Sequence, residues 1–127
     1  MTEPNHQVLN GCRLLIVEDD YLLAIELARG LEDYGAEIAG MAGSVADAEA
    51  LIAMQGDRLD GVVLDINLGD EQVYPVADLL MSRGLPFVFA TGYDLWVIPE
   101  TYAGIPRCEK PIRASVLAHL LAEQMAQ

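Results

Sequence analysis

The chain has 127 residues, 53% of them hydrophobic, and a formal net charge of −13 at pH 7. This length and apolar content suit one globular domain with a substantial core and exclude a disordered chain. The charge argues against nucleic acid as a direct partner, because phosphate backbones are bound by Lys and Arg.

No apolar run approaches the ~18 residues that a membrane span needs. The N-terminal MTEPNHQ has no basic region followed by an apolar block, so no secretory signal is expected. We therefore expect a cytoplasmic protein without a membrane partner.

Short apolar runs alternate with helical patterns along the whole chain. In chain order, the predicted elements are a strand at Arg13–Val17, a helix at Tyr21–Tyr34, a strand at Glu37–Ala42, a helix at Val45–Met54, a strand at Leu59–Leu64, a short helix at Pro75–Ser82, a strand at Pro86–Ala90, a brief strand at Arg107–Glu109 and a last helix at Ile112–Met125. Val116, Leu117, Leu120 and Leu121 are expected to face inward from the last helix. The alternation predicts an α/β fold with parallel strands and right-handed crossovers.

One segment departs from this alternation. Residues 92–106 hold two prolines and two glycines where another helix is expected, so we predict a short or irregular element there. Leu95, Trp96 and Tyr102 make this segment a candidate docking face.

Polar side chains follow four of the five strands. Glu18, Asp19 and Asp20 follow the first strand, while Asp65, Thr91 and Lys110 follow the third, fourth and fifth. In an open parallel sheet these positions lie at the carboxyl edge, where ligands bind. Crowded carboxylates are tolerable if a hard cation joins them, and Mg²⁺ prefers oxygen ligands. With Mg²⁺ bound, Asp65 can act as a nucleophile toward a phosphoryl group.

Each of these residues has a simpler interpretation by itself. Asp20 can be a helix N-cap, Asp65 a turn residue, Thr91 an ordinary strand-end residue and Lys110 a solvated lysine. The prediction of a functional site depends on all of these residues together, because the expected residue types follow the first, third, fourth and fifth strands in order.

The stretches LLIVEDD, VVLDINLGD, FVFATGYD and CEKPI resemble those of a response regulator receiver domain, over about residues 13–125. The resemblance implies a flavodoxin-like (βα)5 doubly wound sheet in the strand order 2-1-3-4-5, as a single domain over residues 1–127 without an output domain. It also implies metal ligands at Glu18, Asp19, Asp65 and the backbone carbonyl of Asn67. Asp65 is then the phospho-acceptor, Thr91 the switch hydroxyl and Lys110 the active-site lysine.

The PFVFATGYD stretch, residues 86–94, also resembles the FAT GUY branch of stand-alone receivers, which are associated with kinases of the HWE or related type. One departure is Arg107, which stands where most receivers carry a switch Tyr or Phe. Tyr93 and Trp96 are candidate replacements, although ordinary packing or contact with a partner is the favoured interpretation of both.

The resemblance predicts a stand-alone receiver that takes a phosphoryl group from a sensor histidine kinase or a histidine phosphotransfer protein. It would be no enzyme beyond catalysing its own phosphoryl transfer and dephosphorylation. It would signal by phosphorylation-dependent protein interaction, or act in a phosphorelay or as a phosphate sink, and the sequence does not choose between these. The alternative is a degenerate receiver that binds proteins without phosphorylation.

Two other classes fit less well. An aspartyl phosphatase would need a second carboxylate at the position of Asn67. A flavin-binding domain would need a phosphate-binding loop after its first strand, where the three acids of this chain would repel the phosphate.

Overall fold

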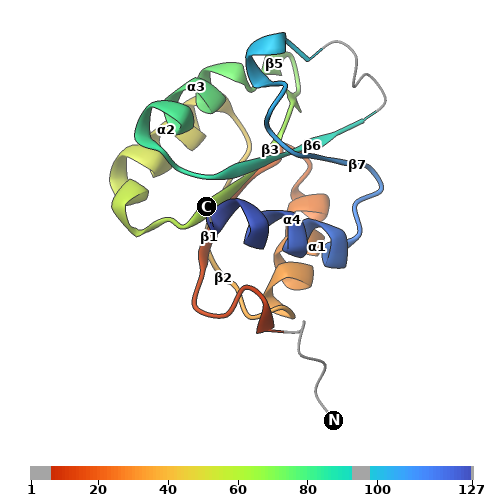
Figure 1. Cartoon of the computed structure of the whole chain (residues 1–127). Helices are drawn as coiled ribbons and strands as arrows, with labels where there is room; N and C mark the ends of the chain where they lie inside the picture. Colours follow the sequence, from red (N-terminus) through yellow and green to blue (C-terminus); the bar gives the residue numbers. More distant parts are fainter. Residues whose placement is uncertain (1–6, 93–97, 127) are drawn as a thin grey trace.

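The computed structural model describes residues 7–92 and 98–126 (Figure 1). Five parallel strands form the main sheet, at β1 (Arg13–Val17), β2 (Glu37–Ala42), β3 (Gly61–Asp65), β6 (Phe87–Thr91) and β7 (Arg107–Glu109). Their spatial order is β2-β1-β3-β6-β7. Since β6 and β7 are the fourth and fifth strands of this sheet along the chain, the predicted order and the flavodoxin-like fold are confirmed.

Among the described residues, four helices cover the sheet, at α1 (Tyr21–Glu32), α2 (Val45–Gln55), α3 (Tyr74–Arg83) and α4 (Ala114–Met125). Helices α2 and α3 lie on one face, and α1 and α4 lie on the other (Figure 1). Within the described ranges, no helix is long and apolar enough to cross a membrane.

The helix boundaries follow from local chemistry. The Asp20 carboxylate accepts a hydrogen bond from the Leu23 backbone N–H at 3.2 Å, which caps α1, and Ser44 caps α2 by accepting from the Asp47 N–H at 3.1 Å. Gly84 ends α3 with φ of 68°, in the left-handed region that glycine tolerates.

The sheet separates two apolar clusters. Alternate residues of each strand point to opposite faces, so Leu64 and Phe89 pack against α2 and α3, whereas Val63 and Val88 pack against α1 and α4. Strand β3 is buried along its whole length, as its apolar sequence predicts for a strand covered on both faces.

The structure adds two small features that the sequence did not predict. A two-stranded antiparallel ladder joins β4 (Asn67–Leu68) to β5 (Glu71–Gln72), and a 3-10 turn forms at η2 (Gly56–Arg58). A further 3-10 turn forms at η4 (Glu100–Tyr102). In the described part of residues 92–106, η4 is the only helical element, as the prediction of an irregular segment requires.

Two predictions about which side chains are buried are wrong. Val116 is 44% exposed, because α4 buries the stripe of Leu117, Ala118 and Leu121, and Val116 lies about 100° around the helix from Leu117. Tyr102, predicted as part of a docking face, is instead 6% exposed and packs in the core. Leu95 and Trp96 of the same predicted face, and Tyr93, lie outside the described residues.

Candidate functional site

The carboxyl ends of four strands meet at one edge of the sheet. The strand register places Val17 beside Leu64, Asp65 beside Ala90 and Thr91 beside Glu109. Residues that follow β1, β3, β6 and β7 are therefore neighbours in space although they are distant in sequence, as the sequence analysis predicted.

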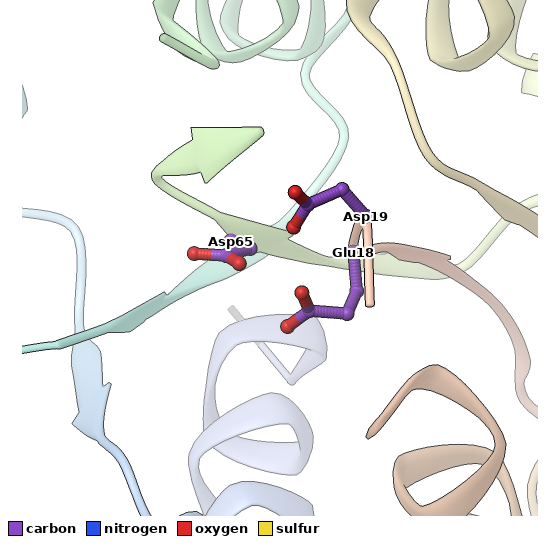
Figure 2. A group of neighbouring side chains, drawn as sticks. All are labelled: Glu18, Asp19 and Asp65. Atoms are coloured by element: carbon purple, nitrogen blue, oxygen red, sulfur yellow. The ribbon is translucent and has the colours of Figure 1, made fainter. Parts of the chain in front are cut away.

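Three carboxyl groups converge at this edge. One oxygen each from Glu18, Asp19 and Asp65 lies within 4.8 Å of the others, and the side chains point into the same space (Figure 2). Glu18 and Asp65 are 4% and 5% exposed, while Asp19 is open to solvent. A cation could therefore reach the group from the Asp19 side and meet two buried ligands.

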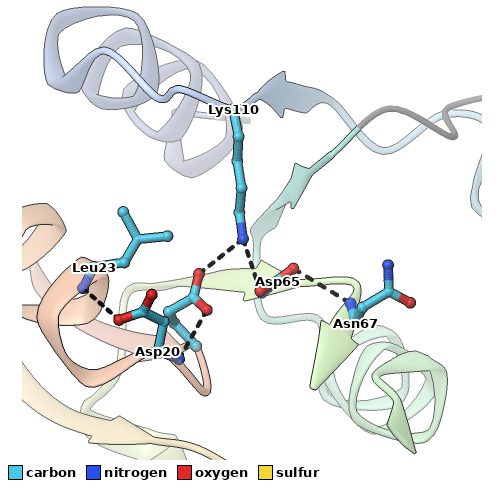
Figure 3. A network of polar contacts seen from close by, with 6 residues as sticks. Asp20, Leu23, Asp65, Asn67 and Lys110 are labelled. Atoms are coloured by element: carbon cyan, nitrogen blue, oxygen red, sulfur yellow. Dashed lines mark hydrogen bonds and ion pairs between the residues drawn. The ribbon is translucent and has the colours of Figure 1, made fainter. Parts of the chain in front are cut away.

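Lys110 extends from the end of β7 into the same group (Figure 3). Its Nζ donates to Asp65 Oδ2 at 2.9 Å and forms an ion pair with Glu18 Oε1 at 3.1 Å. Burial lowers the pKa of the Lys110 ammonium, but the hydrogen bonds and negative charges of Asp65 and Glu18 outweigh burial, and the net shift is upward. Lys110 is therefore a fixed positive charge directly beside Asp65.

The same environment also raises the pKa of Glu18, where it favours the neutral, protonated form. Burial, together with the neighbouring Asp65 carboxyl, raises the pKa of Glu18 from 4.5 to about 7, against the lowering effects of the Asp20 backbone N–H and Lys110. The Asp20 N–H donates to Glu18 Oε2 at 3.1 Å. Among the described residues, Glu18 Oε1 accepts no well-aligned hydrogen bond, although the Lys110 ammonium is close.

These observations fit a hard divalent cation. A buried carboxylate oxygen without a well-aligned hydrogen-bond donor, next to two further carboxyl groups, is the oxygen-rich environment that Mg²⁺ prefers. Asn67 is exposed just beyond Asp65, and its backbone N–H donates to Asp65 Oδ1 at 3.3 Å. Both oxygens of Asp65 are thus held by neighbouring groups, which fixes the orientation of its carboxylate.

The structure also places the remaining predicted site residues. Thr91 is 4% exposed at the end of β6, and its carbonyl accepts a hydrogen bond from the Lys110 backbone N–H at 2.8 Å. Asp20 caps α1, so its simpler interpretation is confirmed. Arg107 pairs with Phe89 in the sheet, two residues before Glu109 pairs with Thr91.

Sequence reasoning missed the supports around this edge. The Glu71 carboxylate accepts a hydrogen bond from the Val45 N–H at 3.1 Å, which ties the β4–β5 hairpin to the start of α2. Gly69 turns the hairpin with φ of 63°, close to the Asp19 carboxylate. The LGD turn in the sequence was the available signal for the hairpin.

Comparisons with known proteins find relatives in sequence and in fold. The sensory transduction protein LytT of Bacillus cereus is 37% identical over 89 residues, which are 68% of this chain and 35% of LytT, so the chain spans about a third of that relative. The solution structure of SdrG from Sphingomonas melonis Fr1 is 34% identical, with a TM-score of 0.75, and the match covers 91% of this chain and 97% of SdrG.

A third similarity concerns the fold alone. A response regulator receiver protein from Sinorhizobium medicae superposes with a TM-score of 0.76 at 21% identity, over 93% of this chain and 97% of that one. No protein-family model matches the chain. The strand order, the acidic group with its lysine, and these relatives lead to one conclusion: the chain belongs to the receiver domains of response regulators.

Proposed function

We propose that the chain is a cytoplasmic phosphoacceptor of two-component signalling, which takes a phosphoryl group on Asp65 in a Mg²⁺-dependent reaction. The observation that carries this proposal is the position of Asp65, buried between Lys110 and two further carboxyl groups. The donor would be a phosphohistidine of a sensor kinase or of a histidine phosphotransfer protein. The FAT GUY stretch favours a kinase of the HWE or related type.

The cation would be held by the carboxylates of Glu18, Asp19 and Asp65 and by the Asn67 carbonyl. When bound, Mg²⁺ supplies positive charge against the phosphoryl oxygens. The residues of the chain provide orientation and charge: Lys110 and the Asn67 N–H hold the Asp65 carboxylate in place, and the Lys110 ammonium also faces the incoming phosphoryl group.

In the transfer step, an Asp65 carboxylate oxygen attacks phosphorus. The new O–P bond forms as the P–N bond to the donor imidazole breaks, and the imidazole nitrogen keeps the bonding pair and takes up a proton. The products are an aspartyl phosphate and a free histidine. Thr91, at the edge beside Lys110, is the hydroxyl proposed to bond a phosphoryl oxygen. The chain would catalyse this transfer and the later hydrolysis on itself, without turning over another substrate.

Exposed apolar side chains next to the site favour a protein donor. Tyr21 and Leu22 begin α1 directly after the acids, and they are 67% and 73% exposed. The phosphoryl group adds about −1.5 to −2 charges at the edge. That change would alter the affinity for a downstream protein, or the group would be passed on in a phosphorelay or lost to hydrolysis in a phosphate sink.

Mass spectrometry after incubation with acetyl phosphate and Mg²⁺ tests the proposal. The wild type and Asp70→Asn, a matched change of an exposed acid in the nearby hairpin, should each gain one phosphoryl group. Asp65→Asn should gain none, and a chelator should prevent the gain in the wild type. An equal gain in Asp65→Asn would refute the assignment, and no gain in any variant would favour the degenerate, phosphorylation-independent receiver.

A further inference from the structure

A cluster of aromatic rings lies on the α2–α3 side of the sheet. The rings of Tyr74 and Tyr102 stack with their centroids 5.0 Å apart and their planes 9° from parallel. Phe89 stands edge-on to both, at 6.4 Å from Tyr74 and 5.9 Å from Tyr102. Phe89 belongs to β6, two residues before Thr91, so the stack rests directly on a strand of the site.

A hydrogen bond fixes the stack from its outer side. The Tyr102 hydroxyl donates to Asp78 Oδ1 at 2.5 Å. Tyr74 and Asp78 are one turn apart on α3, so both groups that hold Tyr102 come from one helix. Burial first, and then the Asp78 carboxylate, raises the pKa of Tyr102 to about 12, so the hydroxyl remains a donor at neutral pH.

The stack joins the two segments that leave the site. Tyr74 begins α3 after the hairpin that follows Asp65, and the Val73 N–H returns to the Ile66 carbonyl at 2.9 Å. Tyr102 lies in η4, in the segment that follows Thr91. In Figure 1 the η4 turn is accordingly found next to the β4–β5 hairpin and the start of α3.

The stack also has an electrostatic neighbour on the last strand. The Tyr74 hydroxyl is buried and, within the described residues, has no hydrogen-bond partner. Burial raises the pKa of Tyr74, and the positive charge of Arg107 acts in the opposite direction. Arg107 pairs with Phe89 across β6 and β7, so it lies beside the aromatic cluster without contributing a ring to it.

We propose that Tyr102 is a positioning residue that couples the segment 98–106 to Asp65, through its stack on Tyr74 and its hydrogen bond to Asp78. When phosphorylation of Asp65 displaces the β4–β5 hairpin or Thr91, one side of the Tyr74–Tyr102 stack moves with it. The hydrogen bond between Tyr102 and Asp78 of α3 transmits that displacement to η4. This inference rests on the proposed phosphorylation of Asp65.

The experiment compares backbone amide NMR shifts with Mg²⁺ alone and with Mg²⁺ plus beryllofluoride as the phosphoryl mimic. In the wild type, we expect shifts at Asp65–Leu68 and also in residues 98–106. Tyr102→Phe keeps the ring but loses the donor, and Asp78→Ala loses the acceptor. Both should retain the shifts near Asp65 and lose most of those in residues 98–106. Asp78→Asn keeps an acceptor oxygen and should respond like the wild type.

Asp78 is exposed, so its variants test the bond even if a change at the buried Tyr102 prevents folding. If Tyr102→Phe and Asp78→Ala both show the same shifts in residues 98–106 as the wild type, the inference is overturned and the proposed function stays intact. A wild type that responds at Asp65 but not in residues 98–106 would have the same consequence. A wild type without any response at Asp65 would overturn the proposed function, and the coupling with it.

Discussion

Replacing Glu18 by Gln in the metal-free protein should change how its stability depends on pH. Glu18 is almost fully buried, and its carboxyl oxygens lie close to those of Asp19 and Asp65. Burial and Asp65 raise its pKa from 4.5 to about 7. The folded state therefore binds the Glu18 proton more tightly than the unfolded chain does.

The sign and size of the effect follow from this linkage. Because the folded pKa is raised, the stability contributed by protonated Glu18 is fully present below about pH 4.5 and is lost as the pH rises through about 7. At about 1.4 kcal/mol per pKa unit, the interval between these two values corresponds to about 3 kcal/mol. A neutral glutamine does not titrate, so Glu18→Gln escapes this loss.

Urea unfolding between pH 4.5 and pH 8 in the presence of a chelator measures the effect. The free energy of unfolding of Glu18→Gln, minus that of the wild type, should rise with pH by up to about 3 kcal/mol. Glu49→Gln, a change of an exposed glutamate on α2, serves as the control and should show no such trend. A pH-independent difference between Glu18→Gln and the wild type would refute the account of this site.

Three further predictions concern the metal, the lysine and the helix contact. Mg²⁺ at one hundred times its dissociation constant should stabilise the wild type by about 2.7 kcal/mol in thermal unfolding. Asp19→Asn should reduce this stabilisation. If Mg²⁺ stabilises Asp19→Asn as much as the wild type, Asp19 is not a ligand. Lys110→Ala should slow phosphorylation by acetyl phosphate by about 10²-fold or more, measured by mass spectrometry over time, whereas an unchanged rate would contradict the role of its charge. Gly30→Ala should destabilise the protein despite a gain in helix propensity of about 1 kcal/mol, because a Cβ at Gly30 would lie 2.7 Å from the Ala114 Cβ. Adding Ala114→Gly should restore the stability. A double variant that stays as unstable as Gly30→Ala would contradict the clash.

The sheet and the acidic edge were predictable because their signals are local and repeated. The apolar run before Glu18 predicts a buried strand, and four strands that each end in a polar residue place those residues together once the strands are parallel. The parallel order follows from the alternation with helices. The described side chains of Glu18, Asp65 and Lys110 meet as this reasoning requires.

The environment of Tyr102 was not predictable in the same way. Pro99, Gly104 and Pro106 lie close to it in sequence and suggest an exposed loop. Its burial depends instead on Tyr74 and Asp78 from a distant helix. The β4–β5 hairpin was missed for another reason: each of its strands has two residues, too few to show a periodic pattern.

The sheet acts as a partition between two separately packed halves of the molecule. Phe89 and Tyr102 belong to the half with α2 and α3, and the contact of Gly30 with Ala114 belongs to the half with α1 and α4. Substitutions in opposite halves share few neighbours, so their effects on unfolding free energy should be additive. Evolution could therefore modify the surface near α1 that we propose for donor binding independently of the surface near η4 that we propose to respond to phosphorylation.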